Sequence, residues 1–196
     1  MLSRRSRRSF RTVSDEELSL FFWHTCKTIR TQPRQKSRSW ESRPLPSAGG
    51  CHPIEVIVMG AVGTAPACSV YEPKSHSLAE MPNQIPTAHI RREIGKVLDP
   101  QEGTACIFAA DRARTDCRYE HPESLIWRDA GILIGGMAVV AEALGMSFCP
   151  LGITGTKILP MLLGPDTNYY GAGGFVIGGK HIDDAANAGR DLALDE

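Results

Sequence analysis

Paired cysteines are missing from this 196-residue sequence. No two cysteines form a CxxC pair, and no group of them has the spacing of a zinc module, which excludes the common zinc and thiol-exchange motifs. Several lie among apolar residues, where a free cysteine behaves as a small hydrophobic side chain. Free thiols are typical of a reducing compartment, so we expect a cytoplasmic protein. The cysteines are Cys26, Cys51, Cys68, Cys106, Cys117 and Cys149.

Long apolar runs are missing as well. No apolar core follows the arginines near the N-terminus, so the sequence predicts no secretory signal peptide. The longest uncharged apolar run, Ala130 to Ala141, is too short to span a bilayer, and we expect no association with a membrane.

Several frequent site signatures are also absent. There is no Rossmann GxGxxG, and no Ser-His-Asp or Cys-His constellation stands out. Cys117, Glu120, His121 and Glu123 lie close together in sequence, but their spacing matches no named metal motif. Polar surface turns often carry such residues, so we expect no metal site.

Charge is balanced overall but unevenly distributed. The formal net charge is 0, yet basic residues far outnumber acidic ones from Met1 to Arg43, and the rest of the chain is acidic. The segment Arg4–Arg11 (RRSRRSFR) is the most basic part. By itself it is compatible with an Arg- and Ser-rich transit peptide, a nucleic-acid contact, a solvated basic arm or a phosphate clamp, because guanidinium groups match phosphate oxygens.

The residues that follow Arg4–Arg11 argue against a transit peptide. Ser14 and Glu17 form the S-x-x-E pattern of a capping box, and apolar residues then recur at helical spacing. Because the basic segment runs directly into structure, a transit peptide is disfavoured. Nucleic-acid binding predicts aromatic residues among the basic ones, and only Phe10 and Trp40 qualify.

The stretch Arg43–Gly60 (RPLPSAGGCHPIEVIVMG) combines a loop with a strand. Two prolines stiffen the loop, and two glycines let backbone N–H groups approach a partner closely. The β-branched residues after Pro53 predict a buried strand. Such a loop suits a flat, hydrogen-bonding ligand, although a plain loop-to-strand connection has the same composition.

The remaining pattern predicts one domain over 1–196. We expect the polar segment 31–42 to be a mobile loop and the acidic tail 183–196 to be exposed. Between them the pattern predicts a hairpin over 70–78, a strand over 53–59, another over 104–110, and one each over 147–152 and 173–179. Helices are predicted after Ser14 and over 88–98, 123–145 and 157–163, with Gly145 as a C-cap.

The order of these parts resembles the flavin-dependent nitroreductase family, and within it the branch of SagB-type dehydrogenases and thiazole oxidases. Five motifs spread over most of the chain carry the resemblance. They are Arg4–Phe10 (RRSRRSF), Arg43–Gly49 (RPLPSAG) followed by Glu55, Tyr71–Leu78 (YEPKSHSL), Asp129–Gly131 (DAG) opening a helix that ends in Ala143–Met146 (ALGM), and Cys149–Gly152 (CPLG).

The resemblance implies an FMN site and assigns residues to it. Arg4, Arg5, Ser6 and Arg8 would bind the phosphate and ribityl end of FMN, and Lys180 would close the phosphate site. Arg43 precedes the loop of Pro46, Ser47, Ala48 and Gly49 that would line the isoalloxazine ring. Leu151 and Gly152 would offer backbone N–H groups near flavin N5 and O4, where a donor stabilises the developing negative charge.

Two positions depart from the branch. Thiazole oxidases carry a Lys-Tyr pair as candidate base and acid, and this sequence has Arg118-Tyr119 in that place. Arginine stays protonated and cannot act as a general base, so only Tyr119 remains as a candidate acid or substrate-orienting residue. The histidine that often follows the Asp-Ala-Gly is Ile132 here, which also argues against azoline oxidation.

The resemblance therefore predicts an α+β nitroreductase-like fold, a central mixed but mostly antiparallel sheet flanked by helices, assembled as a homodimer with FMN at the interface. The expected function is an FMN-dependent oxidoreductase with a ping-pong mechanism. A reduced nicotinamide, NADH or NADPH, would give hydride to flavin N5, and a nitroaromatic, a quinone or a peptide-derived heterocycle would take the electrons. The alternative is a flavin-binding or flavin-sequestering protein, or a degenerate partner subunit, without efficient turnover.

Overall fold

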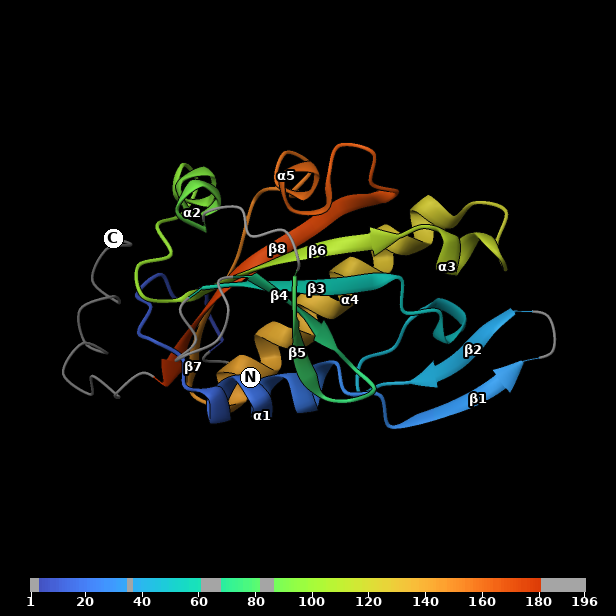
Figure 1. Ribbon diagram of the computed structural model, residues 1–196. Helices are drawn as coiled ribbons and strands as arrows, with labels where there is room; N and C mark the ends of the chain where they lie inside the picture. Colours follow the sequence, from blue (N-terminus) through green and yellow to red (C-terminus); the bar gives the residue numbers. More distant parts are fainter. Residues whose placement is uncertain (1–3, 35–36, 61–67, 82–86, 181–196) are drawn as a thin grey trace, which may run out of the picture.

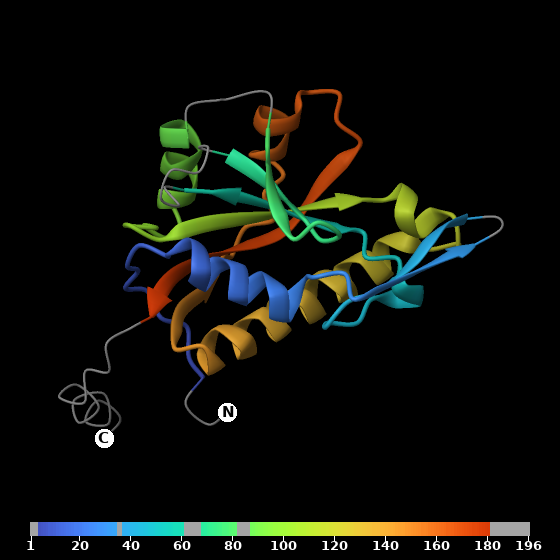
Figure 2. The same ribbon diagram turned by 60° about the horizontal axis from the view of Figure 1, so that its bottom comes forward.

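A six-stranded sheet lies between two layers of helices in the computed structural model, which describes residues 4–34, 37–60, 68–81 and 87–180 (Figure 1). Helices α1 and α4 cover one face of the sheet, and α2 and α5 cover the other (Figures 1 and 2). The elements are α1 (Asp15–Thr25), β1 (Arg30–Arg34), β2 (Ser37–Ser42), a 3₁₀ turn η1 (Ala48–Gly50), β3 (Ile54–Met59), β4 (Cys68–Glu72), β5 (Ser77–Glu80), α2 (Thr87–Gly95), β6 (Thr104–Asp111), α3 (Ala113–Asp116), α4 (Pro122–Ala143), β7 (Met146–Pro150), α5 (Leu159–Leu163) and β8 (Tyr169–Lys180).

The strand order in the main sheet is β5-β4-β3-β6-β8-β7. Each neighbouring pair in this sheet is antiparallel, so the sheet is antiparallel throughout rather than mixed. β6 lies in its middle and is buried over nearly its whole length. The predicted strands over 53–59, 104–110 and 147–152 are confirmed, and the last strand is longer than the predicted 173–179.

Side-chain alternation along the central strands divides the core into two layers, as the pleat of a strand requires. On β3, Val56 and Val58 face the layer of α1 and α4, whereas Ile57 and Met59 face the layer of α2 and α5. Phe21, Phe108 and Phe175 are fully buried in the first layer. Both faces of the sheet are therefore covered, which explains the nearly continuous apolar run of β6.

Local signals at the helix ends are confirmed. The Ser14 side chain accepts a hydrogen bond from the Glu17 N–H, and the Glu17 carboxylate accepts one from the Ser14 N–H, which completes the capping box. Gly145 has a φ of 72° just beyond α4, the left-handed conformation that glycine adopts without a steric penalty.

The segment 31–42 was predicted to be a mobile loop, and this prediction is wrong. β1 and β2 form a two-stranded antiparallel hairpin in which Arg30 pairs with Ser42 and Thr31 with Glu41. The segment is polar, so its sequence shows no apolar alternation that would reveal two strands. The predicted acidic tail 183–196 lies outside the described residues.

Helix α4 is 22 residues long and, by length and composition, apolar enough to cross a bilayer. It extends beyond the uncharged run that appeared too short in the sequence. Core helices of soluble proteins pass the same test. Here Ile126, Met137 and Ala141 are fully buried against the first core layer, as in a core helix.

Candidate functional site

The basic segment at the N-terminus is extended and displays its arginines. Arg4, Arg5, Ser6 and Arg8 are all exposed, whereas Phe10 is buried in the second core layer. We call residues 4–11 the arginine arm. A doubly charged phosphate is bound best by several guanidinium groups, and the arm presents such groups on one short stretch. Its residues therefore fit the phosphate end of a flavin nucleotide.

The arm is fastened through its backbone and through Arg7. The Arg7 N–H donates to the Phe148 carbonyl at 3.1 Å, which ties the arm to β7. The Arg7 guanidinium makes a two-pronged contact with the Glu142 carboxylate, at 2.8 and 3.2 Å. Both side chains are only 16% exposed. Arg7 is thus an anchor, while its neighbours point outward.

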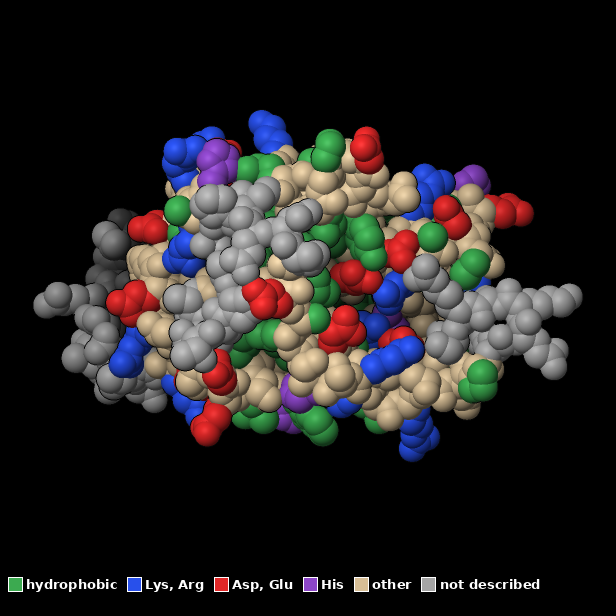
Figure 3. Space-filling view, viewed as in Figure 1, with side chains coloured by type: hydrophobic (Ala, Val, Ile, Leu, Met, Phe, Trp, Pro, Cys, Tyr) green, Lys and Arg blue, Asp and Glu red, His purple; other side chains and the backbone are tan. Residues whose placement is uncertain are grey.

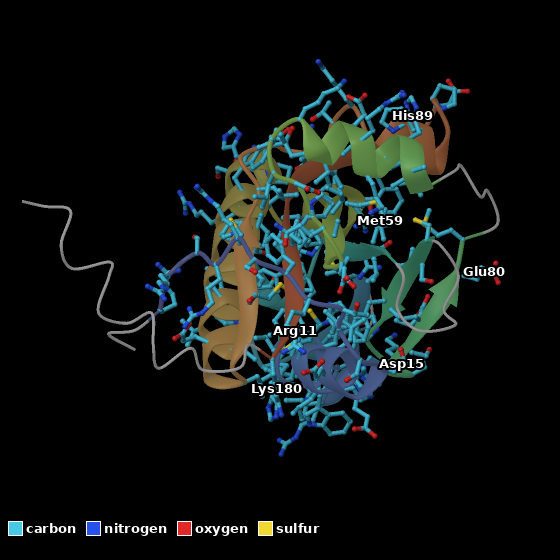
Figure 4. The ribbon with its side chains drawn as sticks, turned by 90° about the vertical axis from the view of Figure 1, so that its left-hand side faces the viewer. Arg11, Asp15, Met59, Glu80, His89 and Lys180 are labelled. Atoms are coloured by element: carbon cyan, nitrogen blue, oxygen red, sulfur yellow. The ribbon has the colours of Figure 1, made fainter. Side chains whose placement is uncertain are left out.

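Lys180 lies beside the arm at the end of β8. The Gly179 N–H donates to the Arg11 carbonyl at 3.1 Å, and Figure 4 shows Arg11 and Lys180 on the same side of the molecule. The Lys180 N–H donates to the Glu17 carboxylate at 2.9 Å, so α1 fixes the backbone of this residue. The Lys180 side chain is exposed, in a position to add a cation to those of the arm.

Leu151 and Gly152 lie in a shallow surface groove with Trp127, Gly131 and Ile134 of α4. The Leu151 N–H donates to the Gly174 carbonyl at 2.9 Å, so this amide is not free for a ligand. Within the described part of the chain, the Gly152 N–H has no protein acceptor. Of the two predicted donors, only Gly152 retains an available amide.

The loop Arg43–His52, which we call the Ser47 loop, is held in place by Asp129 of α4. The Ser47 hydroxyl donates to Asp129 Oδ2 at 2.5 Å, and the Ala48 N–H donates to Asp129 Oδ1 at 3.0 Å. The Ser47 oxygen in turn accepts a hydrogen bond from the His52 N–H at 2.9 Å. Asp129 is 5% exposed, so this contact lies inside the protein.

A cavity of about 110 Å³ lies next to the Ser47 loop. It is lined by apolar side chains and by both acidic and basic residues, among them Arg43, Glu55 and Arg114. Figure 3 shows such mixed charges around the hollow between the sheet and the β1–β2 hairpin. The charges are paired: Arg43 contacts Glu41 at 2.6 Å, and Arg114 contacts Glu55 at 2.6 Å.

Arg43 thus ties the start of the Ser47 loop to β2, and its predicted role in cofactor binding stays a prediction. Burial would raise the pKa of Glu41, but hydrogen bonding and charge from Arg43 outweigh it and hold that pKa below its usual value. Burial, with the nearby Arg43 charge, lowers the pKa of His52 to about 4. The His52 Nε2 lies 3.1 Å from the Glu41 carbonyl, which can accept a hydrogen bond from the N–H of a neutral imidazole.

Tyr119 lies beside the Ser47 loop, as its predicted role requires. A Cβ on Gly49 would come within 2.6 Å of the Tyr119 hydroxyl and 2.7 Å of an Arg118 nitrogen. The Arg118 guanidinium donates a hydrogen bond to the Gly49 carbonyl. Arg118, which cannot act as a base, thus holds the loop, and Tyr119 stays near a position that a ligand over the loop could reach.

The Tyr71–Leu78 motif forms the predicted hairpin of β4 and β5. Burial raises the pKa of Tyr71, so its phenol remains neutral, and the hydroxyl lies in hydrogen-bond contact with His76 Nδ1 at 2.7 Å. The His76 Nε2 lies 2.9 Å from the Ser19 hydroxyl of α1. The tyrosine and histidine of this motif therefore join the hairpin to α1 and do not point to a catalytic role.

The predicted cofactor residues form two groups at opposite ends of α4 (Figure 2). The arm is anchored at Glu142 and the Ser47 loop at Asp129. With a rise of 1.5 Å per residue, these anchors are about 20 Å apart along the helix. Leu151 and Gly152 border residues 127–134 of the same helix, the stretch that also contains Asp129. One chain thus carries the predicted phosphate and ring contacts far from each other.

No group of three or more potential metal ligands occurs in residues 4–34, 37–60, 68–81 and 87–180. The cluster of Cys117, Glu120, His121 and Glu123 does not assemble into a site. All six cysteines fall within these ranges, and none of them forms a disulfide.

Sequence reasoning missed the residues that hold the site together. Asp129 was noted in the Asp-Ala-Gly motif, but its contact with Ser47 joins residues 82 positions apart. Glu142 is the lone acid in the apolar second half of α4, which is a signal in the sequence that it has a specific partner. Without the fold, nothing connected it to Arg7.

Comparison with known proteins agrees with this geometry. The model of the nitroreductase family matches residues 1–178, and the chain belongs to this family. No curated protein sequence matches the chain.

Solved structures have the same fold. The chain resembles a chain of the Escherichia coli microcin synthetase McbBCD complex with truncated pro-MccB17 bound (TM-score 0.68, 15% identity, 93% of this chain and 72% of that one). It also resembles a protein of Ralstonia eutropha assigned as a nitroreductase (0.69, 18%, 91% and 80%). A third is a Staphylococcus epidermidis protein assigned as an NAD(P)H:FMN oxidoreductase (0.59, 12%, 93% and 85%). The family match supports a flavin-type oxidoreductase, and the solved structures show the fold.

Proposed function

We propose that this protein is an FMN-dependent oxidoreductase that works as a homodimer, with FMN held between the arginine arm of one protomer and the Ser47 loop of the other. A reduced nicotinamide would be the electron donor. The acceptor would be a nitroaromatic, a quinone or a peptide-derived heterocycle. The cofactor, when bound, supplies the hydride and electron transfer.

The observation that carries this proposal is the separation of the two groups of residues by about 20 Å along α4. The proposed phosphate contacts are anchored near one end of α4 and the proposed ring contacts about 13 residues before them, a separation that favours contributions from two chains. In a dimer whose two-fold axis passes beside the middle of α4, the C-terminal end of α4 in one protomer lies next to the N-terminal end of α4 in the other. The arginine arm of one protomer then lies near the Ser47 loop of its partner.

The surface of α4 suits such an interface. Ile132 and Val139 are 42% and 37% exposed, although both are apolar. Between them, a Cβ on Gly135 would meet nothing within 4 Å, and the same holds for Gly131. An exposed helix face made of small and apolar residues lets a second helix approach closely and bury apolar surface.

Each group of residues has a defined task in the proposed site. The guanidinium groups of Arg4, Arg5 and Arg8 would bind the phosphate, with Ser6 near the ribityl chain and Lys180 closing the site. The Gly152 N–H would donate toward the ring, where negative charge develops on reduction. The loop from Pro46 to Gly49 would cover the ring, and Tyr119 would donate a proton to the substrate or orient it.

The test is the visible spectrum of the purified protein, followed by chromatography of the released chromophore and by assays of NADH and NADPH oxidation with a quinone or a nitroaromatic. We expect a yellow protein that releases FMN and turns over. A yellow protein without turnover would favour the flavin-sequestering alternative. A colourless protein that also fails to take up added FMN would refute the proposal.

A further inference from the structure

The Ser47 loop is bound to α4 by more than one contact on the same helix face. Asp129 accepts hydrogen bonds from Ser47 and Ala48, and Leu45 lies so close to Gly136 that a Cβ there would be 2.5 Å from a Leu45 methyl. Positions 129 and 136 are two turns apart and point to the same side. The first part of the loop is thus fixed at two points on a rigid element.

The direction of the hydrogen bonds is set by chemistry. An ionised carboxylate only accepts hydrogen bonds, so the proton of the Ser47 hydroxyl is directed at Asp129. The oxygen of that hydroxyl already accepts from the His52 N–H. The Ser47 side chain is therefore engaged within the protein as donor and as acceptor, and its part in ligand binding is to shape the loop.

In the described part of the chain, the Asp129 carboxylate is stabilised by the hydrogen bonds from Ser47 and Ala48. None of the ion pairs in the described part of the chain includes Asp129, although it is 5% exposed. A buried carboxylate is costly unless hydrogen-bond donors surround it. The loop must therefore keep its observed position for Asp129 to retain its hydrogen bonds. Asp129, through the same hydrogen bonds, holds the loop in that position.

The loop also contains backbone conformations that need such support. His52 has a φ of 45°, and Gly49 and Gly50 have φ of 58° and 63°. A non-glycine residue at positive φ persists only where its surroundings hold it. The His52 carbonyl accepts from Arg114 at 3.3 Å, and the Gly49 carbonyl accepts from Arg118, so the loop is held from several sides.

We infer that Asp129 is a positioning residue for the flavin ring: it does not touch the cofactor, but it holds the Ser47 loop in the shape that receives the ring. This inference rests on the proposed function. It assigns a role to Asp129, the acid of the Asp-Ala-Gly motif. It also assigns Ser47 to the support of the loop, whereas the resemblance implied a contact with the cofactor.

The test compares FMN affinity, measured by titration with FMN, in the full-length protein and in Asp129→Asn, Asp129→Ala and Ser47→Ala. We expect Asp129→Ala to weaken FMN binding by about tenfold to a hundredfold, because a loop displaced by about 1 Å loses its fit to the ring. Asp129→Asn keeps an oxygen for the Ala48 N–H and should lose less. Glu123→Gln, an exposed acid on the same helix, is the matched control and should bind FMN normally.

The double variant Asp129→Ala/Ser47→Ala separates positioning from a general loss of stability. If both residues act through one loop contact, the second substitution should add little to the first in FMN affinity. Additive losses, or wild-type affinity in Asp129→Ala, would overturn the inference. If the Asp129 variants do not fold, Ser47→Ala removes the same contact from the loop side, and unchanged FMN affinity in it overturns the inference.

Hydrogen exchange of the Ala48 and His52 amides gives a readout that needs no cofactor. Both amides should be protected in the wild type and exchange faster in Asp129→Ala, which removes the acceptor of the Ala48 N–H. If the wild type binds no FMN, the proposed function fails, and these exchange rates still decide whether Asp129 holds the loop. Equal rates in both proteins would contradict the inference.

Discussion

The two halves of the proposed site are built in opposite ways. The arginine arm is fastened by its backbone and by Arg7, and it leaves the side chains of Arg4 and Arg8 exposed. The Ser47 loop has its polar side chains Ser47 and His52 paired with protein groups, and its backbone is held in unusual conformations. The first half provides charge, and the second provides shape.

This difference indicates how each half would respond to change. The arm depends on the number of its cations, which act together on one anion, so removing them should abolish binding and leave the fold intact. The loop depends on contacts that also stabilise the protein, so changes there should affect stability and binding together. The predictions below use this contrast, starting from the largest effect.

Replacement of Arg4, Arg5 and Arg8 by alanine should remove the cofactor. The three side chains are exposed, so the thermal unfolding temperature of the apoprotein should not change. We expect FMN affinity to fall by more than about a hundredfold, measured by titration and by the chromophore content of the purified protein. Stoichiometric FMN in the triple variant would show that the arm is not the phosphate site.

Substitution of Gly49 by alanine should disturb the loop in two ways. Its φ of 58° costs an alanine about 1 kcal/mol, and the new Cβ would lie 2.6 Å from the Tyr119 hydroxyl. Both stability and FMN affinity should fall. Gly145→Ala is the matched control, because Gly145 also has positive φ, at 72°, but nothing lies within 4 Å of its added Cβ. That control should lose stability only, and equal loss of FMN affinity in both would disprove the role of Gly49.

The protein should lose stability as the pH falls from about 6.5 toward 4. His52 has a pKa lowered to about 4 by burial and by Arg43, so in this range the unfolded chain binds a proton that the folded protein does not. Stability is complete above the unfolded pKa and declines below it. His76, whose pKa is also lowered by burial, adds to the same slope.

Urea denaturation at pH 8 and pH 5 measures this effect. The wild type should lose about 2 kcal/mol more than His52→Gln between the two values, because the variant lacks the group that the unfolded chain protonates. His24→Gln, at an exposed position, controls for the loss of a histidine. The same slope in His52→Gln and in the wild type would contradict the neutral, buried state of His52.

The smallest effect is expected at the anchor of the arm. Arg7→Ala removes the two-pronged contact with Glu142, but the backbone bond to Phe148 remains. We expect FMN affinity to fall by less than about tenfold, since a single ion pair near the surface contributes on the order of 1 kcal/mol. Glu142→Gln should have a similar effect. A loss as large as that of the triple variant would mean that Arg7 itself binds the phosphate.

Local patterns in the sequence gave reliable predictions because they depend on neighbouring residues. The capping box of Ser14 and Glu17, the left-handed Gly145 and the strand after Pro53 are all determined within a few residues. The hairpin of β1 and β2 was missed for the same reason, since a polar ribbon carries no apolar alternation.

The contacts that assemble the site could not be predicted, because they join distant parts of the chain. Ser47 meets Asp129, and Arg7 meets Glu142, across 82 and 135 positions. The motifs named the residues of the candidate site, but they did not distinguish ligand contacts from scaffold. The Leu151 amide illustrates this limit: its motif predicted a donor to the flavin, and the fold uses it to bond Gly174.

The most direct test of the composite site is complementation between two defective proteins. The triple arm variant and Asp129→Ala would be unfolded together and refolded, or coexpressed, and the bound FMN measured. If arm and loop come from different protomers, a mixed dimer contains one intact site, and random pairing should restore about a quarter of the wild-type FMN content. If the mixture binds no more FMN than the two variants alone, arm and loop do not form one site across the dimer.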